Sequence, residues 1–125
     1  MADSSALAGR RVLVVEDEMM IAMLVEDMLA ELGCAVVGPA HALDVALVLA
    51  RTETGIDAAL LDVNLGGQPV FAVADALREK GVPAIFSTGY GDAALREVDR
   101  GCPVLQKPFR AHDLAKALSQ ALGVS

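Results

Sequence analysis

Four short apolar stretches of this chain end in side chains that can bind a metal ion or take part in phosphoryl transfer. Glu16 and Asp17 follow the first stretch, Asp62 the second, Thr88 the third and Lys107 the fourth. If the three carboxylates meet, they repel one another, and burial raises the pKa of at least one of them. Mg²⁺, a hard cation that binds carboxylate and water oxygens, would compensate that charge best.

Together these groups have the composition of a phosphoryl-transfer site. A cation, a lysine and a hydroxyl can stabilise the charge on a transferred phosphoryl group. A carboxylate beside them can act as the nucleophile and form an aspartyl phosphate. Taken singly, each residue has a more ordinary explanation, because acidic residues often begin helices and the others could be turn, strand or surface residues. The interpretation therefore requires that all of them lie at one edge of one sheet.

The spacing of apolar residues predicts the elements that would place them there. Continuous apolar runs, typical of strands buried on both faces, alternate with segments of helical spacing. We expect strands at residues 12–15, 35–37, 58–61, 84–87 and 104–106. In the first expected helix the inward residues are Ile21, Leu24, Val25, Met28, Leu29 and Leu32. A short polar helix is expected near residues 92–99.

Five strand-then-helix units in strict alternation predict an α/β protein, a (βα)5 doubly wound parallel five-stranded sheet with helices on both faces. Such sheets bind ligands beyond the carboxyl ends of their strands. The second expected strand ends in Gly38-Pro39 and offers no functional group there. The strand order 2-1-3-4-5 explains this difference, because it places the second strand at an edge of the sheet.

Composition limits the classes of function. The 125 residues suit a single domain, and the net charge of -7 with 3% aromatic residues makes direct binding to nucleic acid improbable. No apolar stretch approaches the ~20 residues of a membrane-spanning helix, so we expect no membrane insertion. Cys34 and Cys102 match no metal or redox spacing and are expected to be reduced thiols of a cytosolic domain. His41 and His112 are expected to be solvated residues away from the site.

From Arg11 to Leu122 the chain resembles the receiver domains of two-component response regulators. The segments that carry the resemblance are VLVVEDE (12–18), LLDVNLGG (60–67), FSTGYGD (86–92) and VLQKPF (104–109). The resemblance implies a flavodoxin- and CheY-like fold, with one receiver domain over residues 1–125 and a core over 11–122. It also implies a cytoplasmic phosphorelay protein rather than an enzyme, whose own chemistry is self-phosphorylation from small donors and self-dephosphorylation.

The resemblance further implies a role for each acidic residue. Asp62 would be the phosphoacceptor. Asp17 would ligate Mg²⁺ directly, Glu16 would act on it largely through water, and the backbone carbonyl of Asn64 would complete the protein ligands.

The remaining site residues follow the family pattern with two departures. Thr88 would bond a phosphoryl oxygen, Lys107 would bridge the phosphoryl group and the acidic cluster, and the Lys107–Pro108 bond would be cis. Val104 stands where the family usually has Tyr or Phe, so the aromatic residue that moves inward upon phosphorylation is absent. Gly66 replaces the family's common proline.

The pair Gly66-Gly67, together with Phe86-Ser87-Thr88-Gly89-Tyr90-Gly91, resembles the subgroup named for its FAT-GUY motif. Glycines permit unusual backbone angles, so we expect signalling to depend on reordering of the loop from Thr88 to Asp92, in which Gly89, Tyr90 and Gly91 are the switch residues. Tyr90 either moves with this loop or only covers the mouth of the site, and both interpretations stay open.

The partners implied by the resemblance are a sensor histidine kinase or a histidine phosphotransfer protein, and an unknown downstream protein. Met19 and Met23 are expected to point away from the inward face of the first helix, where exposed methionines suit a docking surface; scattered surface methionines are also ordinary. A homodimer through the fourth helix, fifth strand and fifth helix remains open.

Other interpretations are weaker. A haloacid-dehalogenase-like phosphatase would need a second acid where Asn64 stands, and an FMN-binding flavodoxin would place phosphate beside residues 16–18, which would repel it. Within the receiver interpretation, Met1 and the polar residues 2–5 favour a stand-alone regulator, and the C-terminal receiver of a hybrid histidine kinase is the alternative.

Overall fold

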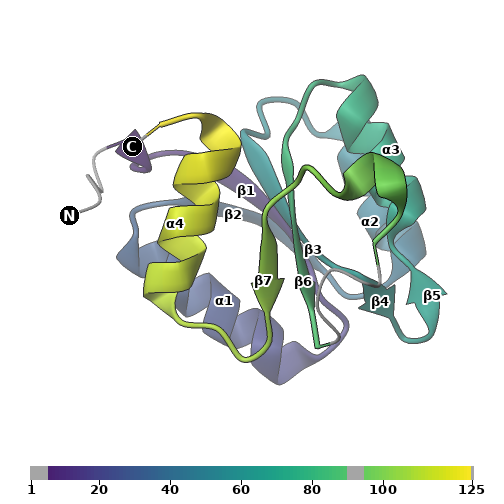
Figure 1. Ribbon diagram of the computed structural model, residues 1–125, viewed down its shortest axis with the longest axis horizontal. Helices are drawn as coiled ribbons and strands as arrows, with labels where there is room; N and C mark the ends of the chain where they lie inside the picture. The colour runs from purple at the N-terminus through teal and green to yellow at the C-terminus, as the bar shows by residue number, and fades with distance from the viewer. Residues whose placement is uncertain (1–5, 90–94, 125) are drawn as a thin grey trace.

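The computed structural model describes residues 6–89 and 95–124 of the chain. At its centre is a parallel five-stranded sheet (Figure 1). In spatial order its strands are β2 (Ala35–Ala40), β1 (Arg11–Val15), β3 (Ala58–Asp62), β6 (Ala84–Thr88) and β7 (Val104–Gln106). Counted along the chain, this is the predicted order 2-1-3-4-5, so the expected topology is confirmed.

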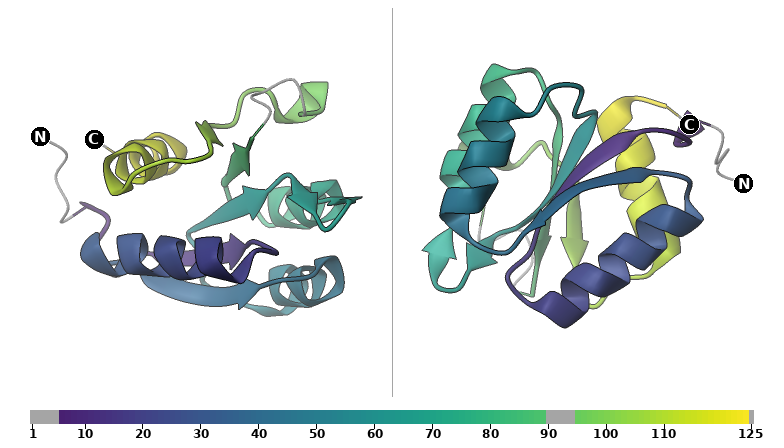
Figure 2. Two further views of the ribbon diagram at one scale, coloured as in Figure 1. Left: turned by 90° about the horizontal axis from the view of Figure 1, so that it is seen from below. Right: turned by 180° about the vertical axis from the view of Figure 1, so that it is seen from behind.

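Helices cover both faces of this sheet. They are α1 (Met19–Glu31), α2 (Leu43–Thr52), α3 (Phe71–Glu79) and α4 (Ala111–Leu122). Seen along the sheet, α1 and α4 lie on one face, and α2 and α3 lie on the other (Figure 2). None of the described helices is long and apolar enough to cross a membrane.

Two separate apolar cores explain why the strands are continuous apolar runs. In β1, Leu13 and Val15 belong to the core under α2 and α3, whereas Val12 and Val14 belong to the core under α1 and α4. Successive side chains of a strand point to opposite faces, so a strand covered on both sides needs an apolar residue at each position. Each strand thereby holds its carboxyl end at a fixed place on one edge of the sheet.

The short polar helix expected near residues 92–99 is present in the described residues as a single 3-10 turn. This turn is η3 (Glu97–Asp99), and it lies between β6 and β7. Residues 90–94 lie outside the described part of the chain. In place of an apolar helical face, this segment buries Leu95 and forms ion pairs through Arg96 and Asp99. The fifth α-helix of a complete (βα)5 repeat is therefore missing from the described residues.

A second correction concerns the inward face of α1. Leu24 is 57% exposed, and the fully buried residues of this helix are Ala22, Val25 and Leu29. Ala22 is buried where Leu24 was expected to be. The face of α1 that packs on the sheet is therefore rotated about the helix axis relative to the predicted face. Leu24 consequently lies among exposed apolar residues near the start of α1.

A small hairpin follows β3. Its strands are β4 (Asn64–Leu65) and β5 (Gln68–Pro69), which pair antiparallel. Gly66 and Gly67 at the turn have φ of 57° and 92°. Positive φ at both central positions is the geometry of two-residue hairpin turns. Proline, whose φ is fixed near −65°, would not fit at Gly66.

Candidate functional site

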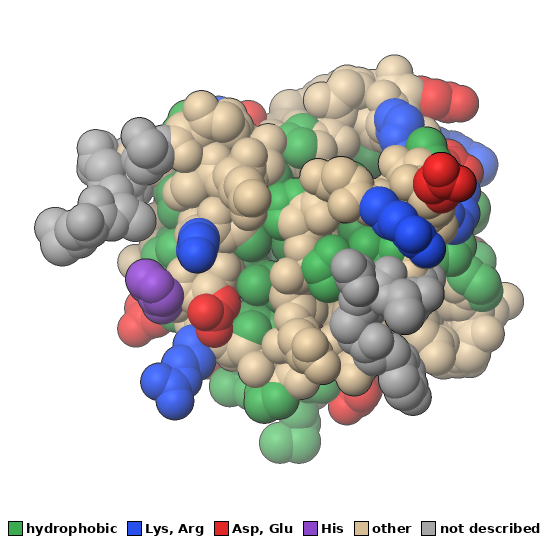
Figure 3. Space-filling model, in the orientation of Figure 1, with side chains coloured by type: hydrophobic (Ala, Val, Ile, Leu, Met, Phe, Trp, Pro, Cys, Tyr) green, Lys and Arg blue, Asp and Glu red, His purple; other side chains and the backbone are tan. Residues whose placement is uncertain are grey.

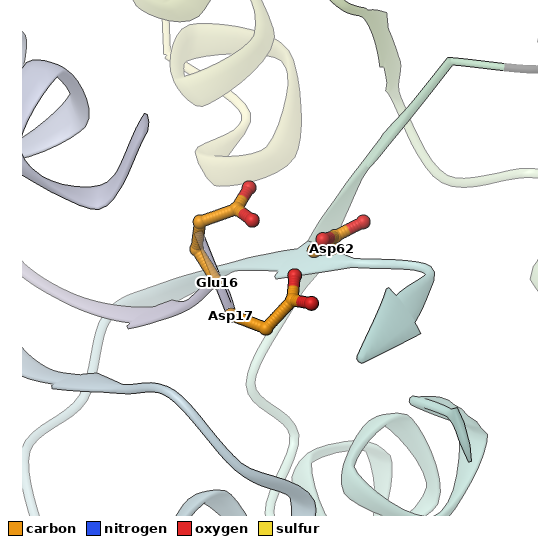
Figure 4. A group of neighbouring side chains, drawn as sticks. All are labelled: Glu16, Asp17 and Asp62. Carbon is orange, nitrogen blue, oxygen red and sulfur yellow. The ribbon is translucent and has the colours of Figure 1, made fainter. Parts of the chain in front are cut away.

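The acidic residues meet because β1 and β3 are neighbouring parallel strands. Val15 pairs with Leu61, so the residues that follow them, Glu16 and Asp62, emerge side by side at the carboxyl edge. Asp17 comes directly after Glu16. The three carboxylates face a common space (Figure 4), and one oxygen from each lies within 4.8 Å of the others. The predicted convergence of these residues is therefore confirmed.

Lys107 supplies the positive charge at this edge. Its Nζ lies 2.8 Å from Glu16 Oε1 and 3.2 Å from Asp62 Oδ2. The backbone N–H of Lys107 donates to the carbonyl of Thr88 at 2.9 Å, which extends the β6–β7 pairing past the end of β7. The Lys107–Pro108 peptide is cis, as expected.

Burial and mutual repulsion set the protonation of the cluster. Burial, followed by the neighbouring Glu16, raises the pKa of Asp62 to about 7, although Lys107 acts in the opposite direction. Burial also opposes the ionised form of Asp17, but hydrogen bonds from Asp62, Glu16 and the Gly66 amide outweigh it and lower the pKa of that carboxyl. Burial opposes the charge of Lys107 as well, and its two acidic partners outweigh it and raise the pKa of the amine.

These carboxylates open into a cavity of about 650 Å³. The cavity is lined by Asp17, Glu18, Asp62, Val63, Asn64, Gly66, Gly67, Pro69, Phe71, Thr88, Gly89 and Lys107. Glu16 does not line the cavity and is only 3% exposed. Asp62 and Thr88 are buried residues whose side chains belong to the ends of β3 and β6. The site therefore has room for a phosphoryl group beside a small cation.

The other predicted site residues lie in three different places. Asn64 is at the start of the β4–β5 hairpin, where its Oδ1 accepts the Gly67 N–H at 2.7 Å. Met19 and Met23 are 65% and 61% exposed on α1. Tyr90 and Gly91 lie outside the described residues.

Three contacts at the site were not predicted. The Gly66 N–H donates to Asp17 Oδ2 at 3.0 Å, which ties the hairpin to an acidic residue. Phe71, at the start of α3, lines the cavity with its neighbours on the hairpin. His41 is exposed and does not line the cavity, as expected, but its Nδ1 lies 2.9 Å from the backbone carbonyl oxygen of Glu16. The spacing of residue types along the chain cannot predict contacts made by a backbone N–H or by a single side chain.

The family model for the response regulator receiver domain matches residues 12–119 of the chain. This chain therefore belongs to the response regulator receiver domain family. The fold, the strand order and the acidic edge all agree with the assignment. It makes the chain a phosphoacceptor receiver domain of a two-component system.

Among its relatives, the phyllosphere-induced regulator PhyR of Methylorubrum extorquens is 33% identical over 114 residues, which are 89% of this chain and 43% of that protein. The solution structure of SdrG from Sphingomonas melonis Fr1 is 44% identical with a TM-score of 0.81, covering 93% of this chain and 98% of SdrG. The chain spans about half the length of the curated relatives it matches.

Mg²⁺ is the cofactor of this domain. Its site chemistry agrees with that assignment, since Glu16, Asp17 and Asp62 together offer the hard oxygen donors that Mg²⁺ prefers. The receiver domain of sensor histidine kinase PA1611 from Pseudomonas aeruginosa PAO1 was crystallised with magnesium in its active site cleft. That receiver is 26% identical with a TM-score of 0.75, covering 93% of this chain and 99% of its own.

Proposed function

We propose that Asp62 is the residue that accepts the phosphoryl group, from a phosphohistidine of a sensor histidine kinase or of a histidine phosphotransfer protein. The observation that carries this assignment is the place of Asp62 in the cavity lining, 3.2 Å from the Lys107 amine and beside Glu16 and Asp17. A carboxylate oxygen of Asp62 attacks phosphorus as the phosphorus–nitrogen bond breaks, and the electron pair of that bond returns to the imidazole.

The neighbours of Asp62 would share the work of charge compensation. Asp17, Asp62 and the Asn64 carbonyl would hold Mg²⁺, with Glu16 acting through water, and the ion would supply positive charge to the phosphoryl oxygens. Lys107 would turn from Asp62 toward the phosphoryl group while Glu16 keeps it oriented. The hydroxyl of Thr88 would bond a phosphoryl oxygen.

The test of this assignment is intact mass after incubation with acetyl phosphate, with and without Mg²⁺. We expect a Mg²⁺-dependent gain of one phosphoryl group in the wild type and in Asp44→Asn, an exposed carboxylate control on α2. Asp62→Asn should show no gain. A gain that persists in Asp62→Asn would overturn the assignment, as would its absence from the wild type with both small donors and kinase.

The start of α1 is the surface that we propose for docking of the phosphodonor. Met19 and Met23 share it with Met20 and Leu24, and these four side chains are 57% to 80% exposed. Hydrophobic side chains protrude there at the lower edge of the molecule (Figure 3). The patch begins two residues after Asp17, so a helical partner lying on it would be next to the cavity.

Signal output is assigned to the loop that follows β6. Val104 is partly buried against the core under α2 and α3, where it offers no aromatic ring to move. We therefore retain the proposal that Gly89, Tyr90 and Gly91 reorder on phosphorylation, which would change contacts with a downstream protein or a second copy. The free thiols Cys34 and Cys102 support action in a reducing compartment, the cytoplasm.

A further inference from the structure

Four charged side chains join α3 to the segment after β6. Arg96 Nε lies 2.7 Å from Asp99 Oδ2, and Arg96 Nη2 lies 2.8 Å from Asp75 Oδ1. Arg78 pairs with the same two carboxylates. We call these residues, Asp75, Arg78, Arg96 and Asp99, the Arg–Asp clamp. Acidic and basic side chains lie together over α3 and η3 on this face of the molecule (Figure 3).

Burial differs sharply within the clamp. Asp99 is fully buried, whereas the side chain of Asp75 is 53% exposed. A buried carboxylate that loses its partner is left with an uncompensated charge, which is costly. The ion pairs of Asp99 with Arg78 and Arg96 are therefore the ones that stabilise the clamp most. Arg96 is fixed from two sides, by Asp99 on its own segment and by Asp75 on α3. Its guanidinium is consequently a well-oriented group although it is partly exposed.

Phe71 links the clamp to the cavity that contains Asp62. The guanidinium carbon of Arg96 lies 4.6 Å from the centroid of the Phe71 ring. Phe71 also lines the cavity that contains Asp62, Thr88 and Lys107. A cation over an aromatic face at this distance is attracted to it. The orientation of the Phe71 ring is thereby tied to charges that lie outside the cavity.

We propose that Arg96 is a positioning residue for the phosphorylated site, which holds the Phe71 ring as an apolar wall of the cavity and so prolongs the life of the aspartyl phosphate. The inference rests on phosphorylation of Asp62 as proposed above. Loss of the phosphoryl group requires attack of a water oxygen on phosphorus while the bond from phosphorus to the Asp62 oxygen breaks. The electron pair of that bond stays on the carboxylate, inorganic phosphate leaves and the water proton goes to solvent. A ring held in place limits the access of that water.

The experiment compares first-order loss of the phosphoryl group, followed by intact mass after removal of the small donor. We expect Arg96→Ala and Phe71→Leu each to shorten the lifetime at least threefold, and Arg96→Lys, which keeps a cation, to restore part of it. Arg100→Ala removes an exposed arginine four residues away that is outside the clamp, and it should leave the lifetime unchanged. Far-ultraviolet circular dichroism at the assay temperature checks that every variant is folded.

The double variant Arg96→Ala/Phe71→Leu separates positioning from simple loosening of the structure. If Arg96 acts through the ring, the double variant loses its phosphoryl group no faster than Phe71→Leu alone. Unchanged lifetimes in folded Arg96→Ala and Phe71→Leu would overturn the inference, and so would effects that multiply in the double variant. Failure of the wild type to become phosphorylated at Asp62 would instead overturn the proposed function, and the inference with it.

Discussion

The carboxyl of Asp62 lies in surroundings that oppose its charge. The residue is 5% exposed and neighbours Glu16, and its pKa is raised from 3.8 to about 7 despite the nearby Lys107. In the metal-free protein it therefore keeps a proton at pH values where an ordinary aspartic acid has lost it. Metal ligands must be deprotonated, so Mg²⁺ binding competes with that proton.

The raised pKa predicts a pH-dependent cost to stability in the absence of Mg²⁺. Below pH 3.8 the Asp62 carboxyl is protonated in both the folded and the unfolded state, so its ionisation does not affect the free energy of unfolding. As pH rises from there to about 7, the folded state retains a proton that the unfolded state has released, so wild-type stability falls. At about 1.36 kcal/mol for each pKa unit, the loss is at most about 4 kcal/mol.

Asp62→Asn lacks this ionisation and should unfold at higher denaturant concentration than the wild type at pH 8 in EDTA. The difference between the two proteins should shrink toward pH 4. Urea unfolding at several pH values measures it, with Asp44→Asn as the control for loss of an exposed carboxylate. A difference that stays constant with pH would contradict the raised pKa.

At the scale of elements, the β4–β5 hairpin orients Asp17, a proposed Mg²⁺ ligand, without itself lying in the five-stranded sheet. The Gly66 N–H holds Asp17 Oδ2, and that N–H is aimed by a turn that needs positive φ at Gly66 and Gly67. Groups that orient a ligand can change metal affinity about 10- to 100-fold. The turn would therefore be part of the proposed metal site although it offers no charged side chain.

Gly66→Ala should weaken Mg²⁺ binding severalfold, measured by isothermal titration calorimetry. Alanine at φ of 57° carries a strain of about 1 kcal/mol, and the turn can relieve it by moving the amide away from Asp17. Gly81→Ala is the matched control, because Gly81 has φ of 73° with no atoms near its added Cβ and lies outside the cavity. Equal loss of Mg²⁺ affinity in both variants would show that the effect is general strain.

The exposed start of α1 gives a second prediction at this scale. Met19→Glu and Met23→Glu should slow phosphotransfer from a cognate kinase about tenfold, because a charge replaces apolar contact area, and leave phosphorylation by acetyl phosphate intact. Val48→Glu provides the control, since Val48 is 58% exposed on α2 and lies outside the patch. Equal losses with both donors would contradict docking at α1 and point to damage of the site.

The elements differ in how far residue patterns can predict them. Strands buried on both faces can be predicted from their continuous apolar runs. The residues that follow these runs were then enough to predict the acidic edge of the sheet. The inward face of α1 was misplaced at Leu24, because the phase of a helical stripe depends on which side the sheet covers. The segment that holds Arg96 and Asp99 is stabilised by ion pairs with α3. These partners are about 20 residues away in sequence, so the local spacing of residues does not predict the ion pairs.

For the molecule as a whole, Mg²⁺ binding is linked to folding. The chain has a net charge of -7, and three of its carboxylates meet at one edge of the sheet. A cation that binds only the folded state stabilises it by about 2.7 kcal/mol at 100 times its Kd. Salt can also stabilise the folded state by screening its overall negative charge, and this effect needs no specific binding site.

Thermal unfolding separates these two effects. We expect MgCl2 to raise the Tm of the wild type well above the value in NaCl of equal ionic strength. In Asp17→Asn and Asp62→Asn the two salts should become nearly equivalent, because one carboxylate ligand is lost while most of the net charge remains. A Mg²⁺-specific rise that persists in both variants would place the cation elsewhere.

The alternation of β1 side chains between two cores has a consequence for how length can vary in this chain. Removal of one residue from β1 would exchange the sets Val12/Val14 and Leu13/Val15 between the two faces. Every position would still be apolar, yet Glu16 and Asp17 would be drawn back by one residue, out of step with Asp62 on β3. We therefore expect insertions and deletions to be better tolerated at the opposite edge of the sheet, for example around Gly55 and Gly81. A change of one residue in β1 should disrupt the site in a protein that retains its apolar pattern.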